Sequence, residues 1–210
     1  MSNGTTVKKR NGRGTEPLDL EKMHKMVEEA CKGVAGVSAS QVEIQSGIQF
    51  YDGITTAEIQ EILIKSASDL IDLDNPNYQY VAARLLLFSL RKSLYGKIRE
   101  LPHLESQIMG CTSYDVYDKE IFIKYSKEEI DKANNFIDHE RDFLFTYAGL
   151  RQVVDKYLVQ DRSTGQAYET PQFMYIMIAL TIFQNYPKEK RLNYVRRYYD
   201  AISKHKLNIP

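Results

Sequence analysis

Apolar residues recur every three or four positions along most of the chain, a spacing that predicts helices. The first clear example carries Leu20, Met23 and Val27 on one face. Asp19 precedes this pattern and suits a helix N-cap, whereas Gly33 suits the position just beyond a helix C-terminus. A first helix is therefore predicted between these two residues.

Two further helices open with the spacing of a capping box, in which Ser or Thr is followed three residues later by Gln or Glu. They begin at Ser38 with Gln41 and at Thr55 with Glu58. A fourth helical pattern follows Pro76, because proline suits the first turn of a helix, where a backbone N–H would be unpaired anyway. Four helices are thus expected in the first half of the chain.

A short β-hairpin is predicted ahead of these helices. Residues 5–9 have the β-branched content of a strand, and Asn11-Gly12 is a strong signal for a tight turn. A brief return strand is expected around Pro17 and Leu18. A small hairpin or sheet capping a four-helix bundle is therefore predicted for residues 1–95.

Residues 96–210 are predicted to form a second, mostly helical domain, so that the fold class is mainly α, of the α+β type. The pattern is less regular over 97–124, and a capping box then opens at Ser126 with Glu129. The other predicted elements are helices at about 127–138 and 143–158, a small hairpin at Ser163-Thr164-Gly165, an apolar helix from Pro171 and an amphipathic helix over 188–204.

Composition narrows the possible partners. Lys plus Arg and Asp plus Glu balance at 28 each, so no net positive field favours nucleic acid or an anionic membrane. The longest apolar stretch, Phe173 to Phe183, is too short to span a bilayer, and no export signal follows the N-terminus. The two cysteines, Cys31 and Cys111, lack metal-binding spacing and fit a reducing compartment. We therefore expect a cytoplasmic protein, with no metal site and with neither nucleic acid nor membrane as a partner.

The segment Val7 to Gly12 contains consecutive cations on a strand that ends in a tight turn. Lys and Arg neutralise a triphosphate, and a glycine lets backbone amides approach it closely. Taken alone, a short basic run is more often a solvated face of an exposed strand. The surrounding residues decide between these two interpretations.

The segment reads V-x-K-R-x-G and is followed by L-x-x-E-K-M-x-x-M over Leu18 to Met26, a combination that resembles the ATP-cone regulatory domain. The stretch Tyr78 to Leu85, Y-Q-Y-V-A-A-R-L, resembles the large subunit of class I ribonucleotide reductases. The resemblance continues through Phe136 to Asp142, Tyr168 to Phe173 and Arg197 to Ser203, and so covers essentially the whole chain.

This resemblance implies an allosteric site for ATP as activator and dATP as inhibitor, with Mg²⁺. Three kinds of contact are carried over from the family: contacts to the adenine and sugar, contacts to the phosphates, and contacts that close the pocket. The first are Val7 and Leu18, the second Lys9, Arg10 and Lys22 with Glu16 beside the nucleotide, and the third Thr56, Ile59 and Lys92.

Three residues depart from the family's pattern. Asp19 stands where enterobacterial members have Asn, and Gln60 and Ser89 stand where they have His. An additional carboxylate repels a triphosphate, and the loss of two imidazoles removes hydrogen-bond donors. For Asp19 the alternative interpretation is a helix N-cap, and the sequence leaves both open.

The resemblance also implies an enzyme whose chemistry lies elsewhere. The family uses a radical cysteine and a redox cysteine pair on a barrel, and neither Cys31 nor Cys111 matches them. The chain ends at Pro210, ahead of the family's Thr-Pro-x-Met-x-Gly segment. We therefore expect the C-terminal catalytic barrel and a small radical-generating subunit as partners, supplied through a split gene or lost by truncation. The last helix, Arg191 to His205, is expected to dock on that barrel through its apolar face.

Two other functions remain open: a stand-alone nucleotide-sensing module and a helical adaptor. The polar run Asp138 to Asp142 is interpreted as a structural helix junction, because no histidine spacing supports a metal site. The fifteen tyrosines, many at helical spacing, are interpreted as packing residues.

Overall fold

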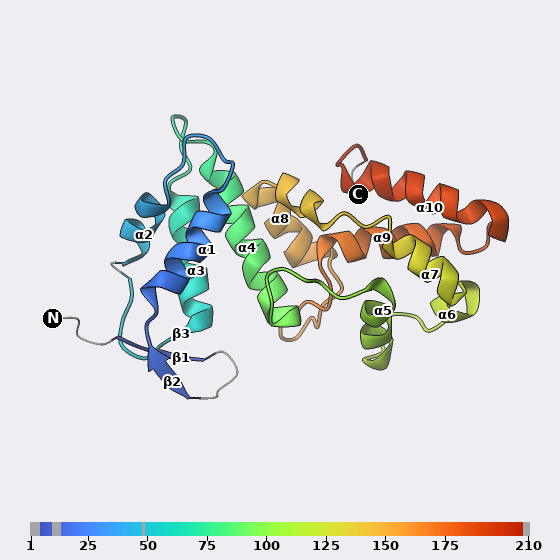
Figure 1. The fold of residues 1–210 in the computed structure, drawn as a ribbon, viewed down its shortest axis with the longest axis horizontal. Coiled ribbons are helices and arrows are strands. Elements are labelled where there is room, and N and C mark those ends of the chain that lie inside the picture. The colour runs from blue at the N-terminus through green and yellow to red at the C-terminus, as the bar shows by residue number, and fades with distance from the viewer. Residues whose placement is uncertain (1–4, 10–13, 48, 208–210) are drawn as a thin grey trace. The chain divides into compact units, whose positions relative to one another are not determined.

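The computed structural model describes residues 5–9, 14–47 and 49–207 (Figure 1). Its internal contacts separate the chain into two compact units. The first unit comprises residues up to Ser89 together with Phe145–Arg151, and the second comprises Leu90–Leu144 and Gln152–Pro210. The short segment 145–151 thus belongs with the first unit although it follows far along the chain, which no local pattern indicated.

A three-stranded sheet begins the first unit. β1 (Thr6–Lys8) lies in the centre, antiparallel to β2 (Thr15–Pro17) and parallel to β3 (Ile54–Thr55). The predicted hairpin is confirmed, although its Asn11-Gly12 turn lies outside the described residues. β3 was not predicted, because a two-residue strand has no periodicity to detect.

Four helices complete this unit, as predicted: α1 (Leu20–Cys31), α2 (Ala39–Gly47), α3 (Thr56–Asp69) and α4 (Tyr78–Tyr95), the last continuing into the second unit. Thr55 and Glu58 form the reciprocal capping box that their spacing predicts. Gly33 has a φ of +71°, which glycine adopts without strain just beyond α1.

The capping box predicted for α2 is wrong. The Ser38 N–H donates to the Tyr78 hydroxyl at 3.0 Å, and that hydroxyl donates to Gln41 Oε1. Tyr78 is buried, so its hydroxyl must find partners, and it uses the groups that would otherwise have paired with each other.

The second unit is helical. Its elements are α5 (Leu104–Ser113), α6 (Ile121–Lys124), α7 (Lys127–Asn134), the 3₁₀ helix η1 (His139–Leu144), the π-helical turn η2 (Val153–Tyr157), α9 (Pro171–Phe183) and α10 (Lys188–Ser203). α8 (Tyr147–Gln152) falls almost wholly in the first unit. The capping box at Ser126, the proline at the start of α9 and the last amphipathic helix are confirmed. The segment 97–124 is more regular than predicted, because it contains α5.

α9 is the core of the second unit, and α10 packs along it (Figure 1). Val195, Tyr199 and Ile202 of α10 are at most 3 % exposed, whereas Tyr194 on the same helix is 36 % exposed. The expectation that the apolar face docks on the barrel is wrong for these three buried side chains, because α9 and α7 already pack against α10. The amphipathic pattern of α10 predicts an apolar packing face, but it does not indicate which element packs against that face.

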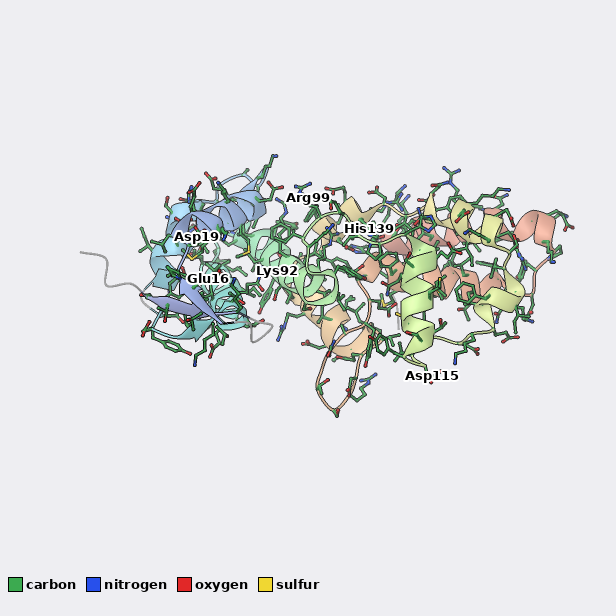
Figure 2. The ribbon with its side chains drawn as sticks, turned by 60° about the horizontal axis from the view of Figure 1, so that its bottom comes forward. Glu16, Asp19, Lys92, Arg99, Asp115 and His139 are labelled. Atoms are coloured by element: carbon green, nitrogen blue, oxygen red, sulfur yellow. The ribbon has the colours of Figure 1, made fainter. Side chains whose placement is uncertain are left out.

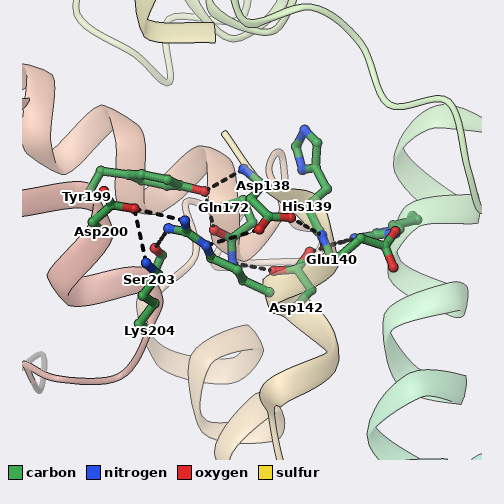
Figure 3. A network of polar contacts seen from close by, with 11 residues as sticks. Asp138, His139, Glu140, Asp142, Gln172, Tyr199, Asp200, Ser203 and Lys204 are labelled. Atoms are coloured by element: carbon green, nitrogen blue, oxygen red, sulfur yellow. Dashed lines mark hydrogen bonds and ion pairs between the residues drawn. The ribbon is translucent and has the colours of Figure 1, made fainter. Parts of the chain in front are cut away.

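A buried polar network joins α4, η1, α9 and α10 within this unit (Figure 3). Arg91 pairs with Asp142 at 2.8 Å, Gln172 Nε2 donates to Asp142 at 2.9 Å, and the Tyr199 hydroxyl donates to Gln172 at 2.7 Å. Arg141 extends the network to Ser203 on α10 at 2.6 Å. The run 138–142 is thus a structural junction, as predicted.

Among the described helices, none combines the length and the apolar character needed to cross a bilayer.

Candidate functional site

Four of the charged residues considered in the sequence lie together where β2 leads into α1. Lys9 follows β1, Glu16 lies on β2, and Asp19 and Lys22 begin α1; Figure 2 labels Glu16 and Asp19. Lys9 Nζ is 2.9 Å from a Glu16 oxygen, and Lys22 Nζ is 3.2 Å from an Asp19 oxygen. Each lysine therefore already has a carboxylate partner. We call these four residues the charged cluster.

The lysines lower the pKa of both carboxylates: Lys9 and Lys22 act on Glu16, and Lys22 acts on Asp19. A hydrogen bond from Lys9 is the main cause that lowers the pKa of Glu16, and the charge of Lys22 lowers it further. The pKa of Asp19 is lowered mainly by the Lys22 backbone N–H, which donates at 3.0 Å, and then by the Lys22 side chain. All four side chains are 39–75 % exposed, so the pairs can exchange partners with a dissolved anion.

Asp19 fulfils one of its two interpretations directly. Its carboxylate caps α1, so the N-cap prediction is confirmed. The same carboxylate also occupies the backbone N–H and the ammonium of Lys22, which are groups that would bind a phosphate. Its second interpretation, repulsion of a triphosphate, is therefore compatible with the first.

The other predicted contact residues are distributed more widely. Val7 on β1 and Ile59 on α3 are 3 % and 7 % exposed and form part of the apolar core of the first unit. Thr56 is the first residue of α3 and is half-buried. Lys92 lies on the last turns of α4, within the second unit, and Arg10 lies outside the described residues.

Leu18, the residue before Asp19, lies on the wall of a cavity of about 680 Å³ in the first unit. His24 and Glu43 also line it, with His24 Nδ1 2.7 Å from Glu43 and Nε2 3.2 Å from Glu28. The hydrogen bond with Glu43 is the main cause that raises the pKa of His24. These acidic groups do not suit a triphosphate. The sequence did not indicate the cavity, because its walls come from segments far apart along the chain. The full lining is Thr5, Leu18, Leu20, Glu21, Met23, His24, Glu43, Ile44, Gly47 and Phe50.

Gln60 and Ser89, the two departures from histidine, are both buried in the first unit, 4 % and 9 % exposed. Gln60 Nε2 lies 3.7 Å from the sulfur of Met26. A buried amide that contacts a thioether belongs to the interior of the helical bundle.

The cysteines are unsuited to nucleophilic chemistry at neutral pH. Burial raises the pKa of both Cys31 and Cys111 to about 11, so both remain thiols. Cys111 lies on α5, near Gln107, and not in an irregular stretch as predicted.

The described residues also include a group of metal-ligating type, formed by His103, Glu105 and Asp131. His103 Nδ1 accepts the Glu105 backbone N–H at 3.3 Å as the N-cap of α5, and Nε2 is 3.8 Å from Asp131. The group is explained by helix capping and surface pairing.

Comparison with known proteins agrees with this geometry. The ATP cone domain family matches residues 5–93, and the family described as ribonucleotide reductase, all-alpha domain, matches residues 143–210. Ribonucleoside-diphosphate reductase 1 subunit alpha of Escherichia coli (strain K12) is 47 % identical over the whole chain, which spans 27 % of that protein. The corresponding alpha subunit of Haemophilus influenzae is 45 % identical over the whole chain, which spans 28 % of it. That of Enterobacteria phage T4 is 41 % identical over 93 % of this chain and 26 % of its own length.

Proposed function

The chain belongs to the ribonucleotide reductase alpha-subunit family, of which it carries the N-terminal region, and we propose that its ATP-cone binds ATP and dATP as allosteric effectors. We assign the cone to residues 1–95 and a helical scaffold domain to residues 96–210, whereas the internal contacts group Leu90–Tyr95 with the second unit and Phe145–Arg151 with the first. The chain is thus part of an enzyme that makes deoxyribonucleotides, and the chemistry lies on a C-terminal barrel.

The observation that carries this proposal is the charged cluster. Lys9 and Lys22 come from different elements, yet their ammonium groups both act on Glu16, which places the two cations within electrostatic range of one carboxylate. A triphosphate is long enough to contact both, and each lysine gains a stronger partner than an exposed carboxylate. The family resemblance assigns Arg10 to the same phosphate site as a third cation.

The remaining contacts follow the family pattern. Val7 and Leu18 contact the adenine and sugar, Glu16 lies beside the nucleotide, and Thr56 and Ile59 close the pocket. Lys92 is assigned to the same role by resemblance alone. Mg²⁺ accompanies the effector, since a divalent cation offsets the repulsion between the phosphates and the carboxylates of Glu16 and Asp19.

We further propose that the chain works in the cytoplasm, that of the host if a phage encodes it. Its partners are the catalytic barrel and a small radical-generating subunit. Co-purification with those two polypeptides tests the assembly, and a chain that adds nothing to reductase activity contradicts it.

Isothermal titration calorimetry with ATP and dATP tests effector binding. We expect binding of both nucleotides by the wild-type chain, and a loss of about tenfold or more in affinity in Lys9→Ala and Lys22→Ala, as a charged hydrogen bond to phosphate is removed. Lys25→Ala is the matched control, because Lys25 lies on α1 and pairs with Glu21 at 2.6 Å outside the cluster. The absence of heat from either nucleotide with the wild-type chain would contradict the proposal and leave a scaffold role.

A further inference from the structure

The second unit contains a cavity of about 420 Å³ beside α9. Met174, Met177, Ile178 and Ile182 of α9 form one side of it, and Ile182 is 48 % exposed. Tyr117, Asp118, Glu120, Tyr157, Val159 and Glu169 also line it. The cavity is mainly apolar, and no lysine, arginine or histidine lines it among the residues that the structure describes.

Glu169 is the buried polar group of this cavity. Glu169 is only 1 % exposed. The Val159 N–H donates to Oε1 at 2.8 Å, and the Tyr117 hydroxyl donates to Oε2. Both partners are neutral donors, which orient the carboxyl group but do not balance its charge.

The other buried ionic groups of the second unit have partners of opposite charge. Asp142 pairs with Arg91, and Arg191 Nε donates to Glu129 at 2.7 Å. Buried charges in proteins are normally paired in this way, because burial without a partner is costly. Among the described residues, no cation acts on Glu169, and burial raises its pKa to about 7. Glu169 is thus a buried acid that lacks a described counter-ion, and it also lines the cavity.

We propose that this cavity binds an ammonium or guanidinium group on an apolar stem, with the Glu169 carboxylate as its counter-ion. The apolar walls accommodate the stem, and the volume falls within the range of small-molecule sites. Asp118 and Glu120 also line the cavity and add negative charge that favours a cation over an anion. This inference is independent of effector binding by the ATP-cone.

Binding of a cation should strengthen as the pH rises through about 7, because the carboxylate form of Glu169 is the one that pairs. Burial raises the pKa values of Tyr95, Tyr117 and Cys111, so these three groups stay neutral over this range and do not supply the effect. The titratable groups that line the cavity or interact with Glu169 are Tyr95, Cys111, Tyr117, Asp118, Glu120 and Tyr157.

The test is an NMR titration of the chain with n-butylguanidinium and n-butylammonium, with n-butanol as the neutral probe of similar stem. The methyl signals of Met174 and Met177 report the site, and the carboxyl ¹³C signal of Glu169 reports its pKa. We expect the cations to bind about tenfold more tightly than the alcohol, as a charge-assisted hydrogen bond provides. The pKa of Glu169 should fall toward the ordinary carboxyl value when a cation is bound.

Glu169→Gln should abolish the preference for the cations, whereas Glu120→Gln, on the same cavity lining, should retain it. Equal binding of alcohol and cations by the wild-type chain, or no binding of any probe, would overturn the proposal. The comparison of the cations with the alcohol uses the wild-type chain alone, so it tests the proposal even if Glu169→Gln is unstable.

The cation could be a free organic molecule or a side chain of the longer protein. Repeating the titration on a complete alpha subunit that contains this region distinguishes these two sources. Continued binding of n-butylguanidinium indicates a free organic cation. Exclusion of the probe, with a Glu169 pKa in the ordinary carboxyl range, indicates a lysine or arginine side chain of the longer protein. Exclusion with that pKa still at about 7 would overturn the proposal.

Discussion

In the first unit the cations of the charged cluster form exposed pairs with carboxylates, whereas the second unit contains ion pairs with buried arginines, Arg91 with Asp142 and Arg191 with Glu129. Lys22 is 75 % exposed beside Asp19, while Arg91 and Asp142 are 3 % and 0 % exposed. Exposed pairs are weak and exchange partners with ions from solution, and buried pairs cannot be broken without leaving a charge in the interior. The first arrangement suits a site whose partner is a ligand. The second suits a scaffold that holds its helices in one geometry.

The buried pair should be far more sensitive to substitution than the exposed one. Arg91→Met leaves Asp142 buried without a cation, and we expect a loss of about 3–5 kcal/mol in the free energy of unfolding. Urea unfolding followed by circular dichroism measures it. Lys9→Met is the matched change in the charged cluster and should leave the urea midpoint nearly unchanged.

The double variant Arg91→Met with Asp142→Leu is the control for this prediction. It removes both charges and should recover much of the lost stability, because no unpaired ion remains. Equal effects of Arg91→Met and Lys9→Met would contradict the contrast between the two units.

Glu169 should make the second unit less stable at higher pH. Its pKa is raised to about 7 in the folded chain, so the folded state holds a proton that the unfolded state releases above its own carboxyl pKa. The stabilisation is complete below about 4.5 and is lost as the pH rises through 7, with a total of about 3 kcal/mol.

The measurement is the difference in unfolding free energy between wild type and Glu169→Gln across pH 4–8. The difference isolates Glu169 from His139, whose pKa is lowered to about 4 by burial and whose effect runs in the opposite direction with pH. A difference that does not change with pH would show that Glu169 titrates normally.

Asp19→Asn should sharpen the function of the charged cluster. Asparagine caps a helix about as well as aspartate, so α1 keeps its cap while Lys22 loses the competing carboxylate. We expect ATP and dATP to bind about tenfold more tightly, the size expected for removing one charge a few ångströms from a phosphate. Calorimetry measures the change. Asp74→Asn removes an exposed charge elsewhere in the first unit and should leave the affinity as it is; an equal gain would mean that overall charge is responsible.

The smallest expected effect concerns features that both units share. Thr55→Ala and Ser126→Ala each remove a capping box, one in each unit, and each should cost about 1 kcal/mol. Thermal unfolding compares the two variants. Similar losses would locate the difference between the units in their ion pairs, whereas a much larger loss in one variant would place it in helix capping.

Much of the fold follows from local signals. The caps at Asp19, Thr55 and Ser126, the proline that begins α9 and the amphipathic pattern of α10 each depend on residues within a few positions of one another. The short strand β3 and the partners of Tyr78 could not be predicted in this way, because they depend on contacts between segments about forty residues apart.

The candidate site shows the same division. The basic strand was visible in the sequence by itself, and Glu16 and Lys22 were assigned through the family pattern. Their pairing was not, because Lys9 and Glu16 approach each other only when β1 and β2 align. Arg91 and Glu169 lay in recognised stretches, yet nothing local indicated that one is paired in the interior and the other lines a cavity.

Residue spacing and capping chemistry were sufficient for the hairpin and the four helices of the first unit, since these depend on neighbours along the chain, and the family pattern supplied the cationic residues. Which charges are exposed, which are buried, and which lack a counter-ion depended on packing between distant segments. That packing sets the dielectric surroundings and the partners of each group, and neither quantity is a property of a short stretch of sequence. The apolar face of α10 illustrates the difference: its pattern predicted a packing face and the barrel was expected to cover it, but α9 covers Val195, Tyr199 and Ile202.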